Sequence, residues 1–257
     1  MLVVQNFLSE EKKNLIQLFH SNKLEEALSI AEKILSVDPN DISILEIKGK
    51  IHLSLGDINS TINCYLKTIQ LNPNCEKNYN AIALLLGKIG QNEKAIQYLN
   101  KSFDINRKNP TTHFNLGFIF FNKKNWHKSA EYFHNAIKIK PYYPDAFYYL
   151  GKIFYNDSQF EKAIIFFKRC IQQKKNHDES FHNIGNSLRD LGRFKDAVFY
   201  YETALEINPN RIDSNHCLGL TFYGLNQFTK GKKIFENILT KNQFDYFAKR
   251  NIAIGQM

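Results

Sequence analysis

Histidine and cysteine, the residues that most often carry metal or nucleophilic chemistry, occur in this chain without the spacing of an active site. The four cysteines are Cys64, Cys75, Cys170 and Cys217. No two of them form a CxxC pair, so the sequence indicates neither a zinc site nor a dithiol redox motif. His127 and His134 are seven residues apart, about 10 Å along a helix, which is too far for both to bind one metal ion.

A second histidine pair, His182 and His216, is separated by 34 residues. We interpret both as solvated or hydrogen-bonded structural residues, the usual role of isolated helical histidines. The motifs HExxH, GxSxG, GxGxxG and the P-loop are absent from the sequence, and each of them places a characteristic catalytic or phosphate-binding group. We therefore predict no catalytic residue, no metal ligand and no cofactor, and hence a protein that is not an enzyme.

The chain is basic, and its charge is evenly distributed. Lys and Arg number 34 against 25 Asp and Glu, a formal net charge of +9 at pH 7. A nucleic-acid-binding protein more often concentrates its cations in one stripe or tail, so the charge favours an acidic protein partner over nucleic acid. No apolar run approaches the roughly 18 residues of a membrane span, and the start MLVVQNFLSEEKK lacks the pattern of a signal peptide. We expect a cytoplasmic protein with free thiols and no membrane insertion.

A 34-residue period runs through the sequence. All six prolines fall into two columns of this period, Pro39, Pro73, Pro141 and Pro209 in one and Pro110 and Pro144 in the other. Five glycines follow the same spacing: Gly49, Gly117, Gly151, Gly185 and Gly219. A fixed period of about 20 to 50 residues is typical of stacked supersecondary units rather than of one closed core.

One unit, residues 110–143, shows how the repeat is built. Pro110 suits the first turn of a helix, where a missing N–H costs nothing, and apolar residues then recur with the helical period. The polar residues 123–125 interrupt this pattern, a second helical pattern follows, and Pro141 ends it because proline cannot donate to the preceding turn. The unit is therefore a helix-turn-helix hairpin.

The recurring glycine needs a packing reason, because glycine costs about 1 kcal/mol against alanine inside a helix. In register with it on the second helices stand the small residues Ala27, Thr61, Ala95, Ser129, Ala163 and Ala197. Beside these stand aromatic residues: Tyr65, Phe133, Phe167, Tyr201 and Phe235. We expect small residues to face each other across each hairpin, with the rings filling the remaining space.

These columns resemble the tetratricopeptide repeat, whose signature is a bulky residue, Leu-Gly and an aromatic residue in the first helix, then Ala, aromatic, Ala and a final Pro in the second. Residues 178–211 carry the pattern in Phe181, Ile184-Gly185, Leu188, Ala197, Tyr201, Ala204 and Pro209. The resemblance implies an all-α protein, a right-handed superhelical solenoid of about seven 34-residue helix-turn-helix repeats.

We assign residues 1–257 to a single tetratricopeptide-repeat array. The repeats are expected at 8–41, 42–75, 76–109, 110–143, 144–177, 178–211 and 212–245. Residues 246–257 are either a capping helix or an incomplete eighth repeat. Residues 173–177, QKKNH, lack the usual apolar residue and proline, so we expect a softer junction there.

The resemblance also implies a binding groove. In this family the first helices line the concave side of the superhelix, and residues flanking the glycine column point into the groove. In repeats four to six these are Phe114, Asn115, Phe118, Tyr148, Tyr149, Lys152, Tyr155, His182, Asn183, Asn186 and Arg189. Tyrosine and arginine are common at binding hot spots, and asparagine can hydrogen-bond the main chain of an extended peptide.

Two specialised members of the family match this groove only in part. The version that clamps the C-terminal carboxylate of a chaperone needs a Lys where His182 stands and an Asn where Cys217 stands, so we do not predict a chaperone tail as the ligand. Asn115 and Asn183 resemble the asparagine rows in the arm of O-linked N-acetylglucosamine transferase, but Tyr149 and Cys217 interrupt these rows.

The predicted function is that of a non-enzymatic scaffold that binds an acidic or aromatic-rich protein or peptide segment in its concave groove. Two alternatives remain open. The chain could be the substrate-recognition arm of a larger protein-modifying enzyme, of the glycosyltransferase, sulfotransferase or hydroxylase type, whose catalytic domain is absent. The less favoured alternative is RNA binding, which the dispersed charge argues against.

Overall fold

The computed structural model describes residues 2–254, and every regular element in that range is an α-helix. In this range the fifteen helices are α1 (Leu2–His20), α2 (Leu24–Val37), α3 (Ile42–Ser54), α4 (Ile58–Leu71), α5 (Glu76–Lys88), α6 (Asn92–Ile105), α7 (Pro110–Asn122), α8 (Trp126–Ile139), α9 (Pro144–Asn156), α10 (Phe160–Gln173), α11 (Asp178–Asp190), α12 (Phe194–Ile207), α13 (Ile212–Gly224), α14 (Phe228–Lys241) and α15 (Tyr246–Ile254). The all-helical fold predicted from the sequence is confirmed.

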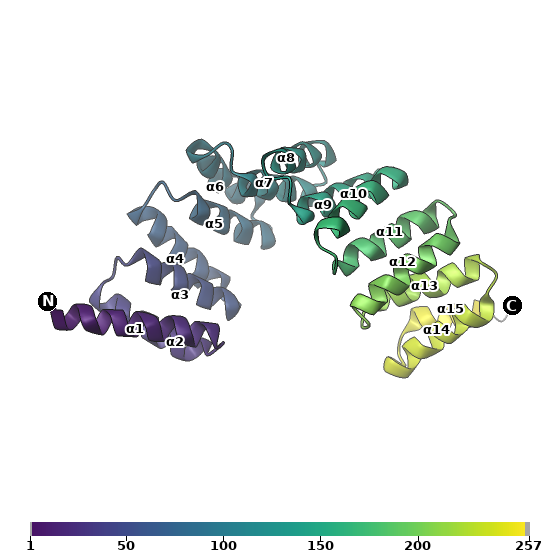
Figure 1. Ribbon diagram of the computed structural model, residues 1–257, viewed down its shortest axis with the longest axis horizontal. Helices are drawn as coiled ribbons and strands as arrows, with labels where there is room; N and C mark the ends of the chain where they lie inside the picture. Colours follow the sequence, from purple (N-terminus) through teal and green to yellow (C-terminus); the bar gives the residue numbers. More distant parts are fainter. Residues whose placement is uncertain (1, 255–257) are drawn as a thin grey trace. The chain divides into compact units, whose positions relative to one another are not determined.

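The helices pair in sequence order, as Figure 1 shows. We call the odd-numbered helices from α1 to α13 the A helices and the even-numbered ones the B helices. Within pairs, α3 packs against α4, α5 against α6, α9 against α10, α11 against α12 and α13 against α14. Each B helix from α10 to α14 also contacts the helix that follows it. The described residues divide into two compact units, an N-terminal unit up to residue 119 and a C-terminal unit from residue 120.

The hairpins with the recurring glycine close where this glycine on the A helix meets an aromatic ring on the B helix. A Cβ atom added at Gly151 would lie 2.6 Å from the Phe167 ring, and one at Gly185 would lie 2.7 Å from the Tyr201 ring. Both rings are fully buried. Real Cβ atoms do not approach other atoms this closely, so the recurring glycine is explained by aromatic packing. Close packing at the glycine is as expected from the sequence, but its nearest neighbour is the aromatic ring and not the small residue of the B helix.

The hairpins without this glycine keep the same combined volume in another way. In the first hairpin Leu15 replaces the glycine and Ala31 replaces the ring; in the third, Ala83 stands opposite Leu99. All four side chains are fully buried. A larger residue on the A helix is therefore matched by a smaller one on the B helix, since a closely packed core conserves volume.

The turn between each A helix and its B helix has one residue in the left-handed region. Seven described residues have positive φ, and they are spaced 34 apart: Asn22, Gly56, Gly90, Lys124, Ser158, Gly192 and Asn226. Glycine and asparagine tolerate this conformation best. Five of the seven positions in this column are Gly or Asn, and Lys124 and Ser158 are the other two; the column was not predicted from the sequence.

Helix α15 covers the last B helix. It contacts α14 and α13, with Ala248 fully buried beside Phe235 and Ile238. Residues 255–257, the end of the segment predicted as a cap or an incomplete repeat, lie outside the described residues. Among the described helices, none has the length and apolar character needed to cross a bilayer.

Candidate functional site

In the C-terminal unit, three A helices, α9, α11 and α13, lie side by side, because α11 contacts both of the others. Eight of the groove residues predicted from the sequence lie on α9 and α11: Tyr148, Tyr149, Lys152, Tyr155, His182, Asn183, Asn186 and Arg189. We call the surface formed by these residues the A-helix face. The helices fix its side chains through three separate sets of contacts.

The first set surrounds Lys152. Its Nζ lies 5.1 Å from the ring centroid of Phe121, 5.7 Å from that of Tyr148 and 5.9 Å from that of Tyr149. These are cation–π distances. Among the described residues no carboxylate lies within 4.0 Å of this ammonium, and burial lowers the pKa of Lys152. Lys152 is therefore a fixed, half-buried positive charge without an acidic neighbour.

The tyrosines beside Lys152 are held by packing on their other sides. Tyr149 stacks on Phe133 at 5.4 Å between centroids, and Tyr148 lies 4.9 Å from the His177 ring. Burial raises the pKa of Tyr148 to about 12. Both side chains are partly exposed. The rings thus serve the packing between repeats and also present a rigid surface.

The second set links α9 to α11 through one carboxylate. Tyr155 Oη donates to Asp190 Oδ2 at 2.6 Å, and Arg189 donates to Asp190 Oδ1 from Nε at 3.2 Å and from Nη2 at 3.1 Å. Burial and the bond to Asp190 raise the pKa of Tyr155 to about 12. Arg189, unlike Lys152, has its charge balanced within the chain.

The third set is a buried network around His182. Asn186 Nδ2 donates to His182 Nε2 at 3.0 Å, Tyr201 Oη donates to Asn186 Oδ1 at 2.7 Å, and His182 Nδ1 lies 2.9 Å from Ser214 Oγ. Because Nε2 accepts, Nδ1 carries the proton and donates to Ser214. Burial lowers the pKa of His182 to about 4, so the ring is neutral at pH 7.

The network explains why His182 and Ser214 together do not form a catalytic pair. Asp213 Oδ2 lies 3.7 Å from His182 Nε2, so the three residue types of a hydrolase triad are close together. Ser214 is fully buried, however. Its hydroxyl has no exposed path to a substrate carbonyl, which a nucleophile requires.

Asn183 is the last residue of the A-helix face, and the other predicted residues lie on α7 in the N-terminal unit. Asn183 Nδ2 donates to Glu179 O of its own helix at 2.7 Å. Phe114 and Phe118 are partly exposed on α7. Asn115 is buried and donates to Asn80 Oδ1 at 3.3 Å. It lines a hollow of about 360 Å³ in the N-terminal unit with Lys77, Asn80, Ala81, Leu84, Asn109 and Thr111.

Asn80 is the centre of a buried polar cluster in the N-terminal unit that the sequence analysis did not predict. Its Nδ2 lies 2.8 Å from Ser102 Oγ and 3.0 Å from Thr112 Oγ1. The two hydroxyls are themselves 2.9 Å apart. The signal in the sequence was weak, because a polar residue at a helical core position is read as exposed unless its partners on other helices are known.

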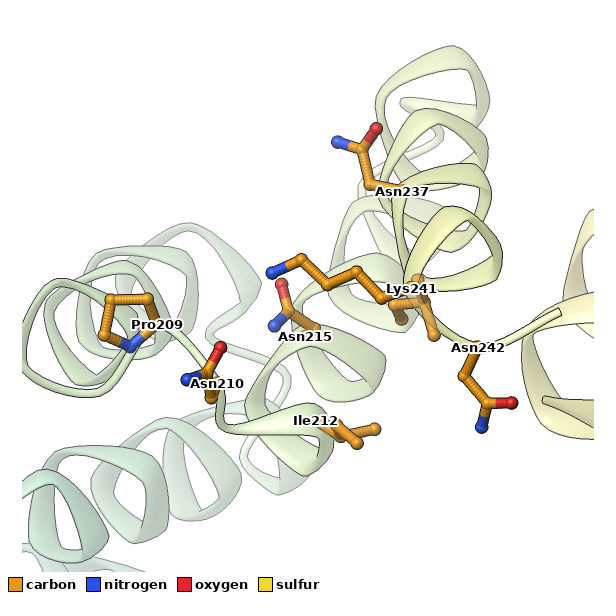
Figure 2. Close-up of a pocket in the computed structure, with 8 residues that line it drawn as sticks. Pro209, Asn210, Ile212, Asn215, Asn237, Lys241 and Asn242 are labelled. Atoms are coloured by element: carbon orange, nitrogen blue, oxygen red, sulfur yellow. The ribbon is translucent and has the colours of Figure 1, made fainter. Parts of the chain in front are cut away.

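A separate hollow of about 260 Å³ lies where α13 begins and α14 ends. Figure 2 shows its asparagines and the Lys241 side chain, which extends toward Asn215. Ile212 and Ile238 give it an apolar component. Its amides do not converge on one point, and no part of it was predicted from the sequence. Within residues 2–254 no group of three or more His, Cys, Asp and Glu side chains is placed to hold a metal ion.

Comparison with known proteins gives the same fold. No curated protein sequence matches the chain significantly. A chain of the APC/C hetero-tetramer Cut9–Hcn1 is 16% identical with a TM-score of 0.76; the match covers 95% of this chain and 48% of that one, so this chain spans about half of its length. YrrB, a tetratricopeptide-repeat protein with an unusual peptide-binding site, is 19% identical with a TM-score of 0.61, covering 72% of this chain and 96% of that one. Pseudomonas aeruginosa pilF is 13% identical with a TM-score of 0.73, covering 84% and 98%.

Models of the tetratricopeptide repeat match four segments of the sequence, residues 42–75, 76–109, 145–175 and 179–211. Together the segments make up just over half of the chain. They fall in both units, on the helix pairs α3–α4, α5–α6, α9–α10 and α11–α12. With its stacked helix hairpins, the chain belongs to the tetratricopeptide-repeat family.

Proposed function

We propose that this protein is a non-enzymatic interaction scaffold, and that its A-helix face in the C-terminal unit binds an extended segment of a protein partner. Likeness to YrrB and Cut9–Hcn1, at 19% and 16% identity, supports a scaffold fold. The binding face is argued from its own side chains. The observation that carries the proposal is Lys152, held over three rings with no carboxylate within 4.0 Å in the described residues.

An ammonium group that is half removed from water and lacks a counter-ion favours an incoming anion. The rings around Lys152 prevent its side chain from turning away to solvent, so the charge is already in place before a partner arrives. Preorganisation of this kind reduces the entropic cost of binding. A carboxylate of the partner segment would pair with Lys152, and the partner's apolar side chains would cover the exposed parts of Tyr148 and Tyr149.

The other polar residues of the A-helix face are bonded to groups of the chain itself. Arg189 is neutralised by Asp190, and His182 and Asn186 are hydrogen-bonded to each other and to Ser214 and Tyr201. These residues shape the floor of the face rather than offer free charges. The proposal that the partner is acidic therefore rests on Lys152, and single substitutions of Lys152 test it.

The proposed single array would extend this face along all the A helices, with α15 as its cap or as the first helix of an eighth repeat. The location of the protein in the cytoplasm is part of the same proposal.

The test uses three variants of the full chain. Partners are captured from the native lysate, identified by mass spectrometry, and the affinity of each purified partner is measured by calorimetry. Lys152→Met keeps the aliphatic stem and removes the charge; we expect affinity to fall about tenfold, or about 1.4 kcal/mol. Lys152→Glu should weaken binding further. Lys138→Met, at an exposed position of α8, is the matched control and should leave this binding unchanged.

Equal loss from Lys152→Met and Lys152→Glu would show that the partner is neutral at this point. Unchanged affinity in both variants, with normal melting, would reject the A-helix face as the binding surface.

A further inference from the structure

Each unit has a hollow on the side of its B helices, and the two hollows are equivalent. In the N-terminal unit the hollow lies between α4 and α6 over α5 and has a volume of about 250 Å³; in the C-terminal unit it lies between α10 and α12 over α11 and has a volume of about 330 Å³. Lining residues correspond at a spacing of three repeats: Leu86 with Leu188, and Tyr98 with Tyr200. The hollow is therefore a product of the repeat architecture.

The two hollows differ in charge. In the C-terminal hollow Lys168, Arg193 and Lys195 stand at its rim, where the N-terminal unit has Leu66, Gln91 and Glu93. The N-terminal hollow has one cation of its own, Lys94, at the position of Asp196. The three cations are therefore particular to the C-terminal unit and not a requirement of the fold.

Two of these cations are not paired within the chain. Arg193 Nη2 lies 2.6 Å from Asp196 Oδ2. Lys168 and Lys195 are exposed, and among the described residues no carboxylate lies within 4.0 Å of either amine. Two free amines thus stand beside one neutralised arginine.

The same hollow has an exposed apolar side. Phe199 lines the hollow and is 62% exposed. Ile165, next in sequence to the lining residue Ile164, is 53% exposed at the equivalent position of α10. Phe199 is fixed edge-on against Tyr200, with 5.3 Å between ring centroids. Ile164 and Leu188 are buried beneath them. Large apolar side chains exposed together and rimmed by charge mark interaction surfaces.

We propose that this hollow is a second docking site, which takes an acidic protein segment with one bulky apolar side chain between its carboxylates. The apolar side chain would enter the hollow over Ile164 and Leu188 beside Phe199, and two carboxylates would pair with Lys168 and Lys195. An RNA strand fits less well, because the floor of the hollow, formed by Ile164 and Leu188, is aliphatic and is not a stacking surface for bases. The site is independent of the A-helix face, whose Lys152 and Tyr155 lie on α9.

The probe is a displayed library of random peptides, selected on the full chain at low salt. We expect the enriched pool to be rich in Asp and Glu around a Phe or Leu. A synthetic peptide from this pool should lose at least tenfold in affinity for the variant Lys168→Glu/Lys195→Glu. Phe199→Ala should also weaken it. All three side chains are exposed, so these variants should melt as the original protein does.

Two matched controls separate this site from others. Leu66→Glu changes the equivalent rim position of the N-terminal hollow and should have no effect on the peptide. Lys152→Met should have none either, whereas peptides bound at the A-helix face would respond to it alone. A labelled single-stranded RNA is titrated in parallel. The proposal is overturned if no acidic peptides are enriched, if the enriched peptides bind the Lys168→Glu/Lys195→Glu variant equally well, or if RNA is the ligand that this variant loses.

Discussion

The complementary volumes across each hairpin make a quantitative prediction about Gly151→Ala. The added Cβ would lie 2.6 Å from the Phe167 ring, which is fully buried. Overpacking of this kind costs about 1–3 kcal/mol, while alanine regains about 1 kcal/mol of helix propensity. Because the clash is with a ring rather than a flexible chain, we expect a net loss of about 1–2 kcal/mol.

Gly87→Ala is the matched control. A Cβ atom at Gly87 would lie 3.5 Å from Ile119 Cγ1, an ordinary van der Waals contact. Only the propensity gain remains, so this variant should be about 0.5–1 kcal/mol more stable than the original protein. The same chemical change should therefore have opposite signs at the two positions. Both variants are measured by urea unfolding followed by far-UV circular dichroism.

The third hairpin shows how to rescue Gly151→Ala, because there Ala83 stands opposite Leu99. Phe167→Leu alone should cost about 1–2 kcal/mol through the cavity it leaves. Combined with Gly151→Ala it should cost much less than the sum, with a coupling free energy of at least about 1 kcal/mol. Additive losses in the double variant, or equal stability of the two glycine variants, would refute the volume argument.

Four further predictions follow from the structure. Ser158 has a φ of 56°, so Ser158→Gly should stabilise the protein by about 1 kcal/mol in urea unfolding and Gly192→Ala should destabilise it by about as much. Asn80→Ala should cost about 1–3 kcal/mol because it removes the shared donor of two buried hydroxyls, and Asn115→Ala should cost less because its bonds to Asn80 are longer. The pKa of His182 is lowered to about 4 from an ordinary value of 6.5, so between these pH values the unfolded chain binds more protons than the folded one. The free energy of unfolding should therefore fall as pH falls through this range, by about 3 kcal/mol at pH 4. His182→Gln should show a shallower loss, and an unchanged slope would argue against a neutral buried ring. Amide hydrogen exchange at residues 172–178 should be as slow as at residues 138–144. Gln173 Nε2 donates to Pro141 O at 2.8 Å, and His177 accepts the Ser180 N–H at 3.2 Å, so side chains hold this junction in place. Faster exchange at 172–178 would support the soft junction expected from the sequence.

The period of the sequence was enough to predict the fold, because helix hairpins in one register can bury their apolar faces only by stacking. Gly151 and Gly185 could be assigned to close packing since the rings they meet recur at the same spacing. That the large Leu15 is matched by the small Ala31 could not be predicted from the sequence, because it requires knowing that the glycine column of the A helices packs against the ring column of the B helices. The column of residues with positive φ includes Gly56, Gly90 and Gly192. It could not be recognised from the sequence because Lys124 and Ser158 occupy two of its positions.

The candidate site was predictable in position and less so in detail. Residues flanking the glycine column could be placed on the A helices from the repeat alone. The repeat alone does not show which of these side chains is free. Ser214 of the next repeat bonds to His182, Asp190 bonds to Arg189 and to Tyr155 of the preceding repeat, and no carboxylate among residues 2–254 lies within 4.0 Å of the Lys152 amine. Long-range hydrogen bonds of this kind have no signature in a single sequence.

Photo-crosslinking from defined positions tests the central claim most directly. A photoreactive phenylalanine analogue replaces Tyr155 on the A-helix face or, in separate proteins, exposed Glu161 on α10, and crosslinked proteins from the native lysate are identified by mass spectrometry. Our account predicts a specific partner crosslinked from position 155, through a segment that contains Asp or Glu, and competed away by an excess of unlabelled protein but not by its Lys152→Glu variant. The same partner crosslinked equally from 161, or none from 155, would contradict the assignment of the A-helix face as the binding surface.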